Sequence, residues 1–232
     1  TMAWNANRRV LSIAGDHGMV YPCYDVRSQG GGAGSASATT HGHKTVCGVG
    51  WNSSGDLLAT GGDDDRLLLW DMTSSTTTPR AVLSFQKSAI KAISWSPRRP
   101  NLLVVGGGVR DRCVRVFDAR EERELARHHV GTQVAGLAWI SDTVIFSAHG
   151  FPTGEVSCLR WSNQTLVSSD KQHGHATRCV VAVPGPRRSV ATVGIEADGD
   201  AVLRMWDVSK SSARKKTGAA SPSSSLLFQG IR

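Results

Sequence analysis

The sequence predicts an all-β fold made of repeated small sheets, and three observations support this prediction. Short apolar runs such as LLLWDM, CVRVFD and VLRMWD recur at a nearly constant interval along the 232 residues. Gly, Asp and Ser separate these runs, as expected between short strands. Helical periodicity is absent, because no window keeps apolar residues at positions i, i+3, i+4 and i+7.

Two independent series of residues mark the repeat. The first series ends a run of small and apolar residues, with spacings of 47, 44, 44 and 44, at Trp4, Trp51, Trp95, Trp139 and Val183. The second ends the next strongly apolar run, with spacings of 46, 47, 44 and 45, at Tyr24, Trp70, Phe117, Trp161 and Trp206. A period in the mid-forties predicts the four-stranded blades of a WD-repeat β-propeller. The runs are apolar on both faces because each blade is packed between two neighbours.

The markers divide the chain into five repeat units and a tail. The units lie near residues 1–27, 46–85, 89–127, 134–169 and 178–208, so residues 1–208 form the propeller blades and residues 209–232 a flexible basic tail. The inserts 28–40 and 73–79 are expected to be flexible surface connections. Pro22 has no N–H group to donate, which predicts an irregular third strand in the first unit.

Composition excludes several classes of protein. A hydrophobic content of 40% is enough for a core, and the five cysteines are odd in number and form no CxxC pair. This pattern argues against a disulfide framework and a thiolate zinc site, and favours reduced, intracellular cysteines. No run is long enough to cross a bilayer and no signal peptide is recognisable. We therefore expect a soluble protein of the nucleus and cytoplasm.

The net charge of +8 comes mainly from the tail. Five of these charges belong to residues 209–232, which contain no acid, at Lys210, Arg214, Lys215, Lys216 and Arg232. A basic, Ser-rich tail is typical of a solvated linker. Nucleic-acid binding is therefore a minor alternative.

One acidic position recurs six residues before the second marker of three repeats, at Asp64, Asp111 and Asp200. In WD repeats such an aspartate lies in a turn and, with a His from a preceding Gly-His pair, supports a buried hydrogen-bond network that leads to a Trp. The His residues of these pairs are His43 and His175, and the Trp residues are Trp70 and Trp206. We expect structural roles for these residues.

No motif predicts an enzyme. The acidic run 63–65 falls at a turn that the repeat requires, and each H-x-H pair, 41–43 and 173–175, includes a His of the repeat pattern. The triple glycine 106–108 lacks the Gly-Lys-Ser/Thr of a phosphate loop, so we interpret it as a turn. We therefore expect no catalytic residue, no metal and no cofactor.

Several longer sequence segments resemble those of one protein family. VCGVGWNSSGDLLATGGDDD, IKAISWSPRRPNLLVVGGGVRDRCVRVFD, TQVAGLAW, FSAHGF, GHATR and SSSLLFQGIR are similar in order to the Fizzy group of WD-repeat activators. These cell-cycle proteins bring substrates to the anaphase-promoting complex, a ubiquitin ligase. The resemblance implies seven blades, so the five visible units are expected to be the C-terminal portion of a longer protein. A closed five-bladed ring is the alternative.

The resemblance also implies sites. Ile231 and Arg232 are expected to dock on a helical-repeat subunit of the ligase. The surface that reads the Lys-Glu-Asn (KEN) degradation signal is implied at Asp63, Val109, Gln133 and Arg178. Asp63 stands where the family usually has Asn, and Val109 where it usually has a small hydroxyl residue. In the destruction-box groove, an acid usual beside Asp200 is replaced by Ala201.

The expected function is that of a non-enzymatic activator and substrate-recognition subunit of the anaphase-promoting complex. Its partners would be ligase subunits, degron-bearing substrates and checkpoint proteins. The alternative is a generic WD-repeat interaction scaffold unrelated to ubiquitin transfer. Ser221, which precedes Pro222 in the tail, is a candidate for proline-directed phosphorylation that would alter docking.

Overall fold

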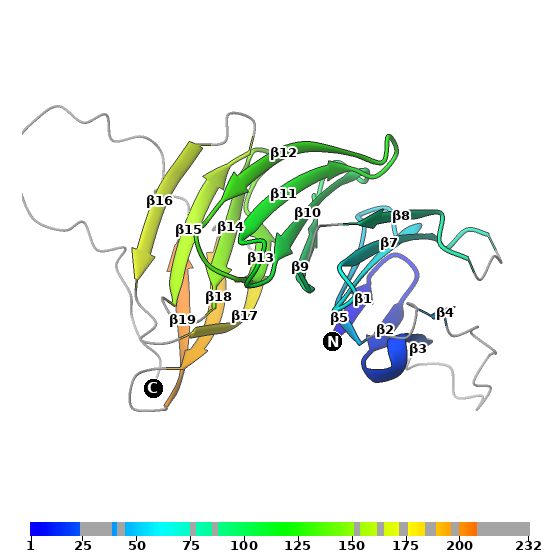
Figure 1. The fold of residues 1–232 in the computed structure, drawn as a ribbon, viewed down its shortest axis with the longest axis horizontal. Coiled ribbons are helices and arrows are strands. Elements are labelled where there is room, and N and C mark those ends of the chain that lie inside the picture. Colours follow the sequence, from blue (N-terminus) through cyan, green and yellow to red (C-terminus); the bar gives the residue numbers. More distant parts are fainter. Residues whose placement is uncertain are drawn as a thin grey trace, which may run out of the picture. The chain divides into compact units, whose positions relative to one another are not determined.

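The computed structural model describes residues 1–23, 39–40, 45–74, 78–84, 88–150, 154–161, 165–171, 176–183, 189–195 and 200–207. The chain divides into two compact units, residues 1–134 and 135–232, which are considered separately. The described residues form five antiparallel sheets and contain no α-helix, which confirms the predicted all-β fold (Figure 1).

The first unit contains three four-stranded sheets whose strands are hydrogen-bonded in chain order. The first sheet consists of β1 (Met2–Asn5), β2 (Val10–Ala14), β3 (Met19–Cys23) and β4 (Thr39–Thr40), with a short 3-10 turn η1 (Asp16–Gly18) before β3. The second consists of β5 (Val46–Trp51), β6 (Leu57–Gly62), β7 (Arg66–Asp71) and β8 (Ala81–Ser84). The third consists of β9 (Ile90–Trp95), β10 (Leu102–Gly107), β11 (Cys113–Asp118) and β12 (Arg123–His129).

The second unit contains a four-stranded and a three-stranded sheet, again in chain order. The fourth sheet consists of β13 (Val134–Trp139), β14 (Val144–His149), β15 (Glu155–Arg160) and β16 (Thr165–Lys171). The fifth consists of β17 (Ala176–Val183), β18 (Ser189–Ile195) and β19 (Ala201–Asp207).

The sequence markers lie at equivalent places in successive sheets. The first series ends the first strand of sheets two to five, at Trp51, Trp95, Trp139 and Val183, and Trp4 is the penultimate residue of β1. The second series is the penultimate residue of the third strand in three sheets, at Trp70, Phe117 and Trp206. The repeat interval is therefore the interval between sheets.

Two local predictions were wrong. Thr39 and Thr40, expected in a flexible connection, form β4 and pair with Val20 and Met19, consistent with the extended preference of β-branched residues. The glycines at 106 and 107, expected in a turn, are the last residues of β10. A Cβ at these two positions would collide with the side chains of Val134 and Asp111, so the third sheet needs glycine there for packing.

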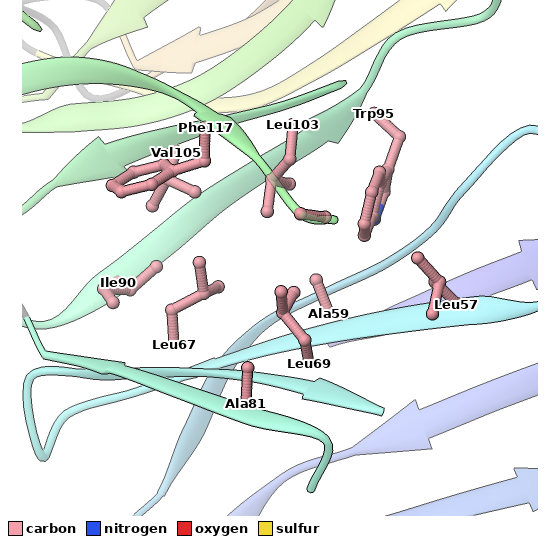
Figure 2. Close-up of a cluster of buried hydrophobic side chains, with 11 residues drawn as sticks. Leu57, Ala59, Leu67, Leu69, Ala81, Ile90, Trp95, Leu103, Val105 and Phe117 are labelled. Atoms are coloured by element: carbon pink, nitrogen blue, oxygen red, sulfur yellow. The ribbon is translucent and has the colours of Figure 1, made fainter. Parts of the chain in front are cut away.

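The core of the first unit lies between its sheets. Leu57, Ala59, Leu67 and Leu69 of the second sheet pack against residues of the third, and Figure 2 shows the two sets facing each other. The third-sheet members of this cluster include Ile90, Trp95, Leu103, Val105 and Phe117. The opposite face of the second sheet packs on the first sheet through Leu58, Leu68 and Trp70, with Ala14 and Val20.

Strands with two buried faces explain the continuous apolar runs. All six residues of β6 and all six of β10 are buried, as the apolar pattern predicted. Each fully buried Leu contributes about 1.5–3 kcal/mol relative to an exposed one, so this packing dominates the stability of the sheets. In the second unit, Phe146 and Trp206 belong to a similar cluster, with ring centroids 5.9 Å apart.

Side chains at the end of each first strand link neighbouring sheets of the first unit. Trp51 Nε1 donates to Ser12 Oγ at 3.1 Å, and Trp95 Nε1 donates to the Gly50 carbonyl at 2.9 Å. Asn5 Nδ2 donates to the Gly55 carbonyl at 3.0 Å, and Asn52 Nδ2 donates to the Pro100 carbonyl at 3.2 Å. The sheets are therefore joined by polar links as well as by apolar packing.

Candidate functional site

One pocket of the first unit gathers charged and polar side chains from the second and third repeats and from the segments that connect the repeats. Its volume is about 440 Å³, and it is lined by Asp63, Asp65, Ser88, Ala89, Lys91, Gly108, Val109, Arg110 and Gln133. The lining comes from the turn between β6 and β7, the start of β9, the loop between β10 and β11, and the residue before β13. Residues far apart in the sequence therefore share one concave surface.

The acidic part of the pocket is a tight turn. Asp63 is exposed, and its N–H donates to the Thr45 carbonyl at 3.1 Å. Asp65 has a φ of 65°, a left-handed conformation that aspartate adopts more readily than most residues. The turn thus presents two carboxylates to the pocket, while the half-buried Asp64 between them is not among its lining residues.

The basic part of the pocket comes from the third repeat. Lys91 is an exposed residue of β9, and Arg110 is exposed in the loop after β10. The Gly108 carbonyl accepts hydrogen bonds from the Arg112 N–H at 2.9 Å and the Asp111 N–H at 3.2 Å, which fixes this loop as a turn. The pocket therefore carries two acids and two bases from different repeats.

Neutral groups complete the lining. Val109 is 58% exposed, although it is apolar. Gln133 is half-buried and directly precedes β13, and Ser88 is buried immediately before β9. Ser88 Oγ has no hydrogen-bond partner among the described residues.

The structure brings together three of the four residues implied for peptide reading. Asp63, Val109 and Gln133 all line this pocket. Arg178 lies in β17 of the second unit, at a register shift between Thr177 and Cys179, and its side chain is outside the described part of the structure. The docking residues Ile231 and Arg232 and the phosphorylation candidate Ser221 also lie outside the described residues.

Sequence reasoning assigned no binding role to the other polar lining residues, Asp65, Ser88, Lys91 and Arg110, although Asp65 belongs to the acidic run interpreted as a turn. Asp65 and Arg110 lie beside predicted residues in the same turns, so turn membership was an available signal. Nothing in the local sequence pointed to Ser88 or Lys91, because only the packing of one repeat on the next places them beside the turn of the second repeat.

Two tryptophans of the expected structural network donate hydrogen bonds to threonines. Trp70 Nε1 donates to Thr60 Oγ1 at 2.9 Å, and Trp206 Nε1 donates to Thr192 Oγ1 at 2.8 Å. These threonines were not anticipated. The expected partners His43 and His175 lie outside the described residues, and Asp200 is exposed.

Asp111 is held by an ion pair. Both oxygens of its carboxylate accept hydrogen bonds from the Arg115 guanidinium, and both side chains are nearly buried. Arg115 also lies 3.2 Å from a carboxylate oxygen of Glu124. In this repeat an arginine, not a histidine, is therefore the recorded partner of the turn aspartate.

The thiols near the pocket are not activated. Among the described residues the free cysteines are Cys47, Cys113 and Cys158. Burial raises the pKa of the Cys47 thiol and of the Cys113 thiol, which disfavours the reactive thiolate form of both. The described residues contain no group of three or more His, Cys, Asp or Glu side chains that could hold a metal ion. They also include no helix long and apolar enough to span a membrane.

Comparison with protein families identifies the repeat. The model of the WD domain, G-beta repeat, matches residues 34–71 and 77–118. These ranges contain most of the second and third sheets. The fold and this match together define a WD-repeat protein.

Comparison with individual proteins gives the family. The B-type cell cycle switch protein ccs52B of Medicago truncatula is 36% identical over 72% of this chain and 33% of its own length. Protein FIZZY-RELATED 3 of Arabidopsis thaliana is 32% identical over 89% of this chain and 40% of its own. Cell division cycle 20.1, cofactor of APC complex, from the same plant, is 32% identical over 90% of this chain and 44% of its own.

A solved structure supports the same relationship. A chain in the crystal structure of the mitotic checkpoint complex matches with a TM-score of 0.77 and 28% identity, over 90% of this chain and 61% of that chain. The protein belongs to the Fizzy family of WD-repeat proteins. The chain spans less than half the length of the three plant relatives described above.

Proposed function

We propose that this chain supplies a substrate-recognition surface of an anaphase-promoting complex activator, and that the pocket of the first unit binds degron peptides. One observation carries the proposal: Asp63, Val109 and Gln133, three of the four positions implied for KEN reading, line the same pocket. The name of an Arabidopsis relative, cofactor of APC complex, supports the choice of ligase.

The charges of the pocket complement a Lys-Glu-Asn segment. Asp63 and Asp65 can pair with the ammonium group of the peptide lysine, and Lys91 and Arg110 can pair with the peptide glutamate. Gln133 can exchange hydrogen bonds with the peptide asparagine. A pocket with acids and bases from different repeats suits a peptide that carries both charges.

The departures from the family pattern alter the expected preference. An Asp at position 63 adds a full negative charge where an amide is usual, so the lysine of the peptide should contribute more to binding. The apolar Val109 offers a methyl surface instead of a hydroxyl group. We propose that the pocket retains KEN recognition with a stronger dependence on the lysine.

The tail completes the proposed activity. Ile231 and Arg232 would dock on a helical-repeat subunit of the ligase, and phosphorylation of Ser221 would weaken this docking by adding negative charge nearby. Checkpoint proteins are proposed as further partners, in agreement with the mitotic checkpoint complex as a structural neighbour. The role is one of binding, with no reaction assigned to the chain.

Charge reversal tests the proposal. A fluorescent peptide containing Lys-Glu-Asn should bind the 232-residue chain, and D63K should weaken this binding by about tenfold, because two like charges would then meet in the pocket. A peptide with Glu in place of Lys should bind D63K better than it binds the unmodified chain. Fluorescence anisotropy at low salt measures all four affinities.

D16K is the matched control. Asp16 is also exposed, but it lies in η1, away from the pocket, so its reversal changes the net charge equally and should leave peptide affinity unchanged. If D63K and D16K behave alike, or if the unmodified chain ignores the peptide, the pocket is not a degron site and the generic scaffold is the better description.

A further inference from the structure

Ser88 is an unusual residue of the pocket, because its hydroxyl is buried without use. The side chain is 4% exposed, and Ser88 Oγ has no hydrogen-bond partner among the described residues. Buried hydroxyl groups nearly always have a partner, because removing them from water without one is unfavourable. Within the described part of the chain, the Ser88 hydroxyl is therefore an unsatisfied polar group, which is unfavourable for stability.

The surroundings of the hydroxyl connect it to the cavity. Ser88 and Gly108 both line the pocket, and a Cβ atom on Gly108 would come within 2.7 Å of Ser88 Oγ. The hydroxyl can occupy this position only because residue 108 has no side chain. Serine also has a single side-chain torsion with three staggered positions, so a ligand can draw Oγ toward itself by one rotation.

We propose that Ser88 is a specificity-determining residue of the pocket, and that its hydroxyl, together with Gln133, hydrogen-bonds the side-chain carboxamide of an Asn in the bound peptide. This inference rests on the proposed degron-binding function. The charged groups of the pocket, Asp63, Asp65, Lys91 and Arg110, are suited to charged side chains. A hydroxyl can donate one hydrogen bond and accept up to two, so it can pair with either the C=O or the NH₂ of a carboxamide.

The cost of leaving Ser88 unpaired produces the selectivity. A peptide with Asn would satisfy the hydroxyl, whereas a peptide with Leu, similar in shape, would leave it buried and unpaired. Sites built to form a hydrogen bond reject analogues that lack the matching group. Ser88 thus lowers the affinity for peptides with an apolar residue at this position.

The test is a two-by-two comparison of Ser88 and S88A with two peptides, Lys-Glu-Asn and Lys-Glu-Leu. The change from Ser88 to Ala should weaken binding of the Asn peptide by about fivefold and should not weaken binding of the Leu peptide. The ratio of Asn-peptide affinity to Leu-peptide affinity is compared between the unmodified chain and S88A. The difference in hydrophobicity between the two peptides cancels in this comparison. The free S88A protein should also melt at a higher temperature than the unmodified protein, because the unpaired hydroxyl is gone.

S12A is the matched control, since Ser12 is equally buried but its Oγ accepts a hydrogen bond from Trp51. It should lower the melting temperature and leave the Asn-to-Leu ratio unchanged. G108A, which closes the space beside Ser88, should weaken both peptides.

The two proposals fail in different ways. If neither peptide binds the unmodified chain, the degron-binding function is wrong. If the Lys-Glu-Asn peptide binds but S88A keeps the same Asn-to-Leu ratio, only the role of Ser88 is overturned. A fall in the melting temperature of S88A would show that the hydroxyl has a structural partner and would also contradict the inference.

Discussion

At the scale of single residues, the aromatic side chain of the third strand and a nearby side chain of the second strand are complementary in hydrogen bonding. In each sheet, one residue of the second strand pairs with the third-strand residue that lies two positions before the aromatic. This second-strand residue is Thr60 in the second sheet, Val105 in the third and Thr192 in the fifth. The indole N–H groups of Trp70 and Trp206 donate to their threonines, whereas the side chain of Phe117 has no N–H group and Val105 has no hydroxyl. In these three sheets, the indole donor and the hydroxyl acceptor are therefore present together or absent together.

This matching predicts the effect of T60V. The change should reduce the free energy of unfolding by about 1–3 kcal/mol, because the buried Trp70 N–H group would lose its acceptor. In a W70F background the same change should cost less, since the indole N–H that donates to Thr60 would be absent. Urea unfolding of the four proteins measures this coupling, and equal costs in both backgrounds would contradict it.

The sequence alone revealed only one half of each pair. The tryptophans stand out by their spacing, but a threonine in a strand is common and carries no spacing signal of its own. Only the antiparallel register, which depends on the turn lengths between strands, shows that Thr60 and Trp70 meet.

At the scale of elements, the side chain after the first-strand tryptophan organises the following turn. Asn52 Oδ1 accepts the N–H groups of Gly55, Asp56 and Leu57 at 2.9, 3.1 and 3.0 Å. Asn5 accepts two such groups in the first sheet, and Ser96 accepts the Arg99 N–H in the third. The strands were predictable from apolar runs, but this turn chemistry appeared only with the coordinates.

The same turn predicts a pH dependence. Hydrogen bonds from Ser54 and Asn52 hold the pKa of the Asp56 carboxyl below its usual range. A lowered folded-state pKa contributes stability above the unfolded pKa of about 3.9, and this contribution is lost as pH falls through the folded value. D56N, which cannot ionise, should therefore be less stable than the unmodified protein at pH 7, with a smaller difference at pH 3.

Urea midpoints of both proteins at the two pH values give the comparison. S54A in the D56N background should have less effect than S54A alone, because the carboxylate that accepts the Ser54 hydroxyl would be absent. A stability difference that does not change with pH would mean that the Asp56 charge makes no contribution.

At the scale of the whole molecule, the candidate site depends on the order of the repeats. Asp63, Ser88, Val109 and Gln133 come from separate turns and strand ends. Asp63 meets Ser88 and Val109 because the second sheet packs on the third. The family resemblance supplied three of them in advance. Ser88 could not be predicted, since its significance lies in a missing partner, which is a property of packing.

The tail gives a prediction for the complete protein. Removing residues 231 and 232 should reduce capture of the purified anaphase-promoting complex by about tenfold or more, because an apolar side chain and several charge-assisted hydrogen bonds would be lost. K216A removes one positive charge from the same tail and should leave capture unchanged. Equal losses would indicate a general electrostatic attraction, and no loss would contradict docking through the terminus.

The link from Asn5 to Gly55, and the similar link from Asn52 to Pro100, always run from one repeat to the turn of its successor. The first repeat therefore carries a donor for the second, and the second repeat carries a donor for the third. A gene duplication that copied one whole repeat would reproduce both ends of this joint at once. Duplication of a whole repeat would thus preserve the hydrogen bonds between neighbouring repeats. Insertion of half a repeat would leave one donor and one acceptor without a partner.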